Sequence, residues 1–152
     1  MSKTINTVFL KESIGASENL LRKLKERITF LDILSRKLDE RKIEINFISE
    51  LGFDPEGDFL KGKRAVQRSK KALGKVENGK AKDPAKLEDI SYEAMINLHY
   101  RVRYCLNEID TICYIFEDKY GKEAAAALEE AEFEFIVNDE PELSDAAVVY
   151  AP

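Results

Sequence analysis

Glycine, proline and long apolar runs are scarce in this 152-residue sequence, which has seven glycines and four prolines. Turn-rich β folds need many such residues, so their scarcity and a charged content of 35% favour long solvated helices. No stretch approaches the roughly 18 continuous apolar residues of a membrane span. The first residues have too short an apolar stretch for a secretory signal peptide. We therefore expect a soluble, cytoplasmic protein with no membrane partner.

Histidine and cysteine are also rare, which removes most catalytic and metal chemistry. His99 is the only histidine, so no histidine-rich zinc site can form within one chain. Cys105 and Cys113 lie about 12 Å apart along a predicted helix, too far for a disulfide between them. We expect reduced thiols, with a cross-chain disulfide as the alternative. The sequence predicts no enzymatic activity, no metal and no cofactor.

Two short segments match nucleotide or calcium motifs only in part. The segment Gly57–Lys63 has the spacing of a phosphate loop, but Arg64 replaces the Ser or Thr that would bind magnesium. The segment also follows a predicted helix instead of a buried strand. Acidic residues at 54, 56 and 58 begin like a calcium loop, but Phe59 and Ala65 stand where Gly and a bidentate Glu are needed. Both motifs are rejected in favour of a turn followed by a helix.

Apolar periodicity and helix-terminating residues predict an all-α fold, an elongated helical bundle. Ser17 is suited to cap the first helix, Gly52 to end it and Gly121 to end the third. Pro84 follows an aspartate, a pattern typical of a helix start. The sequence thus predicts two long helices at about 17–51 and 84–120, and two shorter ones at about 58–76 and 122–132.

The two ends of the chain carry other patterns. Residues 4–10 are β-branched and apolar, and residues 132–137 alternate between acidic and apolar side chains. The first pattern predicts a short strand or a packed arm, and the second an extended segment like a strand edge. Residues 138–152 are acidic and predict a flexible tail. The expected organisation is therefore one helical domain over residues 1–137 followed by an acidic tail.

Leucines of the first predicted helix, including Leu31 and Leu38, form a short coiled-coil-like seam. The two long helices have only two short partners to cover them, so apolar surface should remain for another chain. A long hairpin that dimerises is the alternative to a closed bundle. Tyr92, Tyr100 and Tyr104 occupy one flank of the third helix, and tyrosine is favoured at protein interfaces as well as at bundle boundaries. These five are candidate interface residues.

The net charge of −5 conceals a strong asymmetry along the chain. Five cations of the second predicted helix are spaced by three and four, so they form one stripe, the basic stripe: Lys61, Arg64, Arg68, Lys71 and Lys75. From residue 117 onward carboxylates dominate. The basic stripe has three interpretations: a contact to a phosphate backbone, a face docked on the acidic C-terminal segment, or a solvated face.

Together these features predict a non-enzymatic helical adaptor or structural accessory protein that acts through protein–protein contacts and self-associates. The second hypothesis is a nucleic-acid-associated accessory protein that binds phosphate backbone through the basic helix 61–82. A small, charge-rich helical chain without catalytic motifs is also typical of a phage accessory protein.

Overall fold

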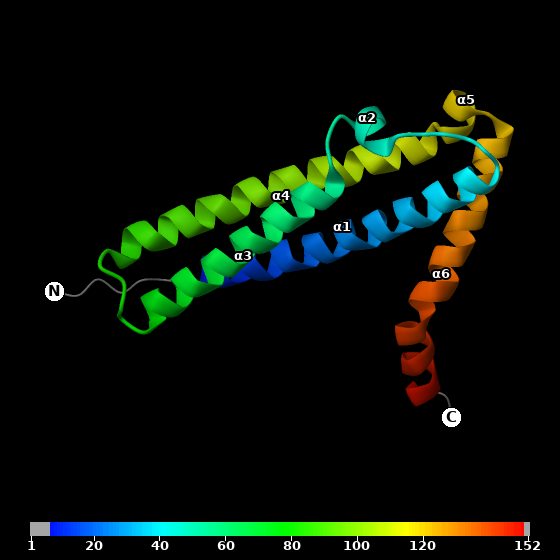
Figure 1. Ribbon diagram of the computed structural model, residues 1–152. Helices are drawn as coiled ribbons and strands as arrows, with labels where there is room; N and C mark the ends of the chain where they lie inside the picture. Colours follow the sequence, from blue (N-terminus) through cyan, green and yellow to red (C-terminus); the bar gives the residue numbers. More distant parts are fainter. Residues whose placement is uncertain (1–6, 151–152) are drawn as a thin grey trace. The chain divides into compact units, whose positions relative to one another are not determined.

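The computed structural model describes the backbone of residues 7–150 and the side chains of residues 7–138. This part of the chain forms helices and no strand (Figure 1), which confirms the predicted all-α fold. The helices are α1 (Val8–Glu40), α2 (Phe47–Leu51), α3 (Pro55–Glu77), α4 (Pro84–Tyr114), α5 (Phe116–Tyr120) and α6 (Lys122–Tyr150). The two long helices of the prediction correspond to α1 and to α4 with α5.

The first predicted helix is shifted and divided. α1 begins at Val8, so residues 8–10 are helical instead of extended, while residues 4–6 lie outside the described residues. α1 ends at Glu40, and Lys42 then takes a left-handed conformation with φ of 59°. The separate helix α2 starts where the side chain of Asn46 accepts a hydrogen bond from the Ser49 amide. Gly52, at φ 82°, ends a helix as predicted, but that helix is the short α2 and not one continuous helix over 17–51.

The C-terminal part of the fold is more helical than the sequence pattern suggested. α6 continues through residues 132–137, so the extended segment predicted there is wrong. Alternation of acidic and apolar residues over six positions is a short-range signal, and adding residues to an existing helix is easy compared with starting one. The backbone of α6 reaches Tyr150, so the helix extends into the predicted tail. The side chains of residues 139–150 and the whole of residues 151–152 lie outside the described part of the chain.

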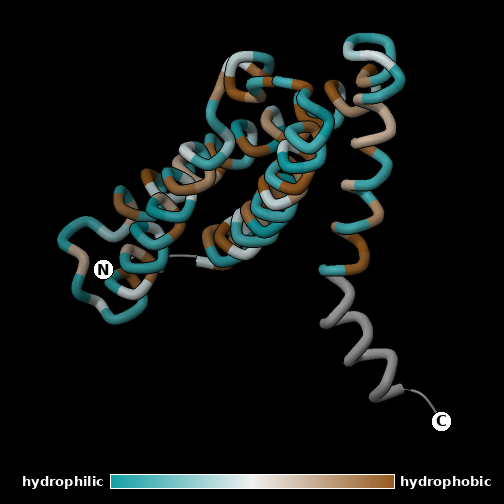
Figure 2. Tube along the Cα trace, turned by 45° about the vertical axis from the view of Figure 1, so that its right-hand side comes forward, coloured by the Kyte–Doolittle hydropathy of each residue, from teal (hydrophilic) through white to brown (hydrophobic). Residues whose placement is uncertain are grey.

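The described contacts group into two compact units. Unit 1 contains residues 1–25 and 54–107, and unit 2 contains residues 26–53 and 108–152. A single domain over residues 1–137 stays a prediction. Figure 2 shows apolar and polar residues interspersed along the helices, the pattern that lets each helix bury one side.

In unit 1 the core lies between the first half of α1, α3 and α4. Gly62 of α3 faces two leucine side chains, because an added Cβ atom would lie 2.7 Å from a methyl carbon of Leu21 in α1 and 2.7 Å from one of Leu98 in α4. The absence of a side chain at this position leaves room for these two leucines in the core. The surrounding core consists of Leu10, Ile14, Leu24, Val66, Ala72, Met95, Val102 and Cys105.

Unit 2 has an aromatic core. The rings of Phe30 in α1 and Phe135 in α6 meet edge to face at 6.2 Å, and those of Phe47 in α2 and Phe116 in α5 stack at 6.4 Å. The α6 side of this core is made of small residues that let the helix pack closely: Ala124, Ala127 and Ala131.

Candidate functional site

The basic stripe lies on the solvent-exposed side of α3. All five of its cations are exposed, while Gly62, Val66, Ser69 and Ala72 are buried on the other side of the helix. With a rise of 1.5 Å per residue, the stripe from Lys61 to Lys75 is about 21 Å long. Its middle is hollowed into a shallow depression lined by Arg64, Gln67, Arg68, Lys70 and Lys71.

The stripe cations have no ion pair within the described part of unit 1. By contrast, the neighbouring Lys70 binds Glu18 of α1 at 2.6 Å, and Lys11 binds Glu77 at 2.7 Å. Lys70 of α3 thus has a carboxylate partner, whereas the stripe cations have none among the described residues of unit 1.

The start of α3 is fixed by local capping. The Asp54 side chain accepts a hydrogen bond from the amide of Glu56, and Pro55 occupies the first helical turn. Gly57 and Gly62 lie inside this helix, so the segment that resembles a phosphate loop has no loop geometry. The acidic positions 54, 56 and 58 belong to the same helix start, so they form no calcium loop either.

A polar cluster that the sequence did not reveal links α3 to α4. Arg101 donates from Nε to Asp58 Oδ1 at 3.0 Å and from its terminal nitrogen to Oδ2 at 2.8 Å. The Sγ of Cys105 lies 3.6 Å from Asp58 Oδ2. Burial, with the charge of Asp58, raises the pKa of Cys105 to about 12, so the thiol stays protonated and is a poor nucleophile. The cluster is therefore structural, and it holds the N-terminal part of α3 against α4.

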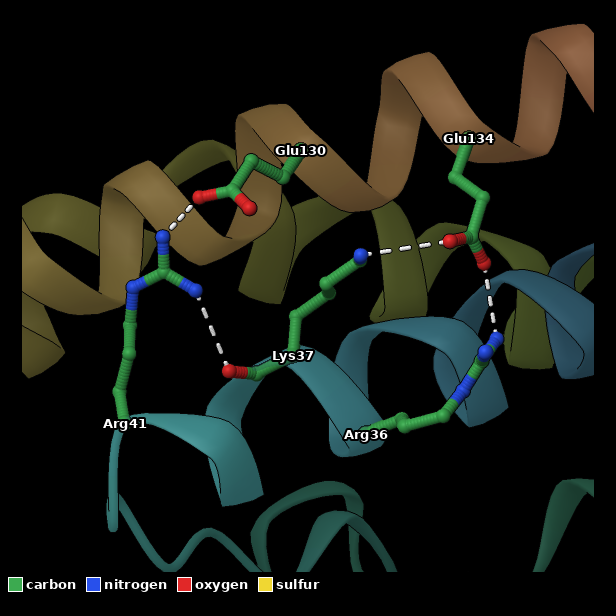
Figure 3. A network of polar contacts seen from close by, with 5 residues as sticks. All are labelled: Arg36, Lys37, Arg41, Glu130 and Glu134. Atoms are coloured by element: carbon green, nitrogen blue, oxygen red, sulfur yellow. Dashed lines mark hydrogen bonds and ion pairs between the residues drawn. The ribbon is translucent and has the colours of Figure 1, made fainter.

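Two carboxylates of the acidic segment are bound within unit 2 by cations in the last turns of α1 and directly after it (Figure 3). Glu134 contacts Arg36 at 2.8 Å and Lys37 at 3.3 Å, and Glu130 is paired with Arg41. The hydrogen bond from Lys37 and the charge of Arg36 lower the pKa of Glu134. These two glutamates therefore already have cationic partners, so their charges are compensated without the basic stripe.

An exposed apolar surface on α6 was also missed by the sequence reading. Phe133, Ile136 and Val137 are 72%, 61% and 46% exposed, and we call them the α6 patch. Their spacing of three and four places them on one helix face, roughly opposite the buried alanines. Residues 132–137 were expected to be extended, so this face could not be recognised. A groove beside it is lined by Lys37, Glu129, Glu130, Phe133, Glu134 and Val137.

The predicted interface residues divide into two groups. Leu31 and Leu38 are 7% and 1% exposed in unit 2, so the proposal that they face a second chain is corrected: they belong to the core of their own chain. Tyr92, Tyr100 and Tyr104 are exposed on α4, as an interface would require. Their role in contacts stays a prediction.

The remaining candidates are the single histidine and the second thiol. His99 is half-buried in a groove with Phe9, Tyr92, Met95 and Ile96. Cys113 is a free thiol near Arg27, and burial raises its pKa. Among the residues with described side chains, no three His, Cys, Asp or Glu residues come together to hold a metal ion.

No helix in the described part of the chain is both long and apolar enough to cross a membrane. Comparisons with protein-family models, curated proteins and solved structures found no match to this chain.

Proposed function

We propose that this chain is a non-enzymatic helical adaptor or structural protein that self-associates through the α6 patch. The observation that carries the proposal is the exposure of Phe133, Ile136 and Val137 on one face of α6. Single exposed apolar residues are ordinary, but a group on one helix face is typical of an interaction site.

The two-sided apolar character of α6 supports a second contact for this helix. One side packs in unit 2 through Ala127, Ala131 and Phe135, while the α6 patch is on the other side. Covering the second apolar face would remove it from water, which favours a contact with another surface. A second copy of the chain offers an identical apolar surface, and a two-fold contact would cover both patches at once.

Charge compensation around the α6 patch makes a contact between two copies feasible. The patch is bordered by four glutamates, which would repel those of a second copy if all were uncompensated. Glu130 and Glu134 already form ion pairs with Arg41, Arg36 and Lys37. Among the described glutamates that border the patch, only Glu129 and Glu132 remain to repel a second copy. Repulsion between exposed charges of this kind makes the free energy of association only slightly less favourable.

The direct test is the molar mass in solution, measured by light scattering over a range of protein concentrations. We expect the mass of the wild type to rise with concentration and that of F133D/I136D to stay at one chain. The control I48D/I90D changes two apolar residues of similar exposure, 53% and 55%, on α2 and α4, and should associate like the wild type. A wild type that stays monomeric at high micromolar concentration contradicts the proposal.

A further inference from the structure

Independently of self-association, we propose that the basic stripe of α3 binds the phosphate backbone of duplex nucleic acid without reading its sequence. The stripe is on a different helix from the α6 patch. Either proposal can therefore fail without the other.

The charge density of α3 is the first argument. Residues 59–76 contain no Asp or Glu, and seven cations: Lys61, Lys63, Arg64, Arg68, Lys70, Lys71 and Lys75. In a protein with a net charge of −5, this stretch creates a local field of the opposite sign. Close to the stripe, within a Debye length of about 8 Å at physiological salt, this field attracts polyanions even though the net charge of the chain is negative.

The second argument is that the stripe is exposed and uncompensated. All five of its side chains are exposed, and none has an ion pair in the described part of unit 1. Docking on the acidic segment was the competing explanation. However, Glu130 and Glu134 of that segment are held by Arg36 and Lys37 of α1 and by Arg41, which follows α1. These two carboxylates therefore have other partners, and the exposed cations of the stripe are available to an external anion.

Rigidity and length form the third argument. The close contact at Gly62 and the pair of Asp58 with Arg101 hold α3 against its neighbours, so the cations lie on a fixed, straight line. The stripe is about 21 Å long, a length over which duplex DNA carries about 12 phosphates. Preorganised cations lose less freedom on binding than cations on a flexible segment.

The composition of the surface selects the duplex backbone from other polyanions. Proteins that bind single strands stack bases on aromatic side chains, but residues 60–77 contain no aromatic residue. Membrane-surface helices insert an apolar face, whereas Val66 and Ala72 of α3 are buried in unit 1. The stripe therefore offers positive charge, but no aromatic side chain to stack on bases and no apolar face to insert into a membrane.

The experiment measures binding of a fluorescent, random-sequence DNA duplex to the full chain by fluorescence anisotropy. Each phosphate contact contributes about −0.9 to the slope of log affinity against log salt, so five contacts give a slope of about −4.5. Between about 50 and 200 mM salt the affinity should then fall about 500-fold. The variant R64E/R68E/K71E should lose three contacts, reducing the slope by about 2.7 and abolishing binding at about 0.1 M salt.

A matched charge reversal distinguishes the effect of the stripe on DNA affinity from the effect of net charge. The variant K23E/K86E/K122E changes the net charge by the same amount, at exposed lysines on α1, α4 and α6. It should keep a steep salt slope and most of the wild-type affinity, and circular dichroism should show that both variants stay folded. If the two variants weaken binding equally, the stripe is not the site.

Other ligands give outcomes that overturn the proposal. A single strand of the same sequence should bind more weakly than the duplex, and vesicles containing phosphatidylserine should not compete. A wild type that fails to bind the duplex even at low salt refutes the proposal. Preference for the single strand or for the vesicles refutes the duplex assignment and identifies the polyanion that the stripe recognises.

Discussion

Arg101 of α4 binds both carboxylate oxygens of Asp58 on α3, at 3.0 and 2.8 Å, across 43 positions of sequence. The Asp58 side chain is only 13% exposed, so this pair is better shielded than most surface ion pairs. We expect D58N to lower the free energy of unfolding by about 1–2 kcal/mol, because it weakens a charged, two-point hydrogen bond. Urea denaturation measures this difference, and D58N with wild-type stability would show that the pair contributes nothing.

Two glycines of α3 should respond in opposite ways to alanine. At Gly74 no neighbouring atom lies within 4 Å of an added Cβ, so G74A should stabilise the chain by up to about 1 kcal/mol through helix propensity. At Gly62 the same gain is offset by overpacking against Leu21 and Leu98, which costs about 1–3 kcal/mol. Thermal or urea unfolding should therefore give G62A a lower free energy of unfolding than G74A. Equal stabilities would contradict the tight contact of Gly62 with the two leucines.

Leu38 tests the corrected position of the leucine seam. At 1% exposure it belongs to the core of unit 2, so L38A should cost about 2–5 kcal/mol of unfolding free energy. Denaturation measured at a concentration where the chain is monomeric gives this value directly. A variant that lost self-association but kept monomer stability would instead support the original interface role.

Cys105 should make stability depend on alkaline pH. Burial, with the charge of Asp58, raises its pKa to about 12, above the ordinary value of 9.0, so the folded state binds the proton more tightly than the unfolded state. The contribution of Cys105 to stability is thus fully present below about pH 9 and is lost as the pH rises from about 9 to 12. Burial also raises the pKa of Tyr120, which acts in the same direction. Denaturation at several pH values should show a shallower alkaline loss for C105A than for the wild type.

Salt should distinguish two ways in which copies could meet. If α6 patches pair with each other, added salt should strengthen association by screening Glu129 and Glu132 of the two copies and by favouring apolar burial. If instead the patch meets the basic stripe of another copy, salt should weaken association. Light scattering at low and high salt measures the sign, and weakening would contradict the two-fold contact.

Local signals in the sequence were sufficient for much of the fold. Gly52 and Gly121 each end a helix and Pro84 begins α4, as predicted. Pro55, which the sequence pattern places in a turn before the helix, begins α3. These residues act through their own backbone geometry and the nearest amides, so their effect hardly depends on distant parts of the chain. The basic stripe was equally accessible, since spacing by three and four defines one face of any helix.

Tertiary packing decided whether residues 132–137 are helical or extended, which the local sequence pattern left ambiguous. Residues 132–137 alternate like a strand, yet they continue α6, where Phe135 meets Phe30 of α1. The α6 patch became visible only with this helical geometry.

The sequence by itself determined an all-α chain with a basic helix and an acidic C-terminal segment, because composition, caps and spacing act over a few residues. Only the tertiary structure decided that Leu38 is buried, that Gly62 lies between two leucines, and that Asp58 pairs with Arg101. Each of these facts depends on which helix faces lie in contact. Contacts between residues distant in sequence are set by the packing of the whole unit, which no local pattern encodes.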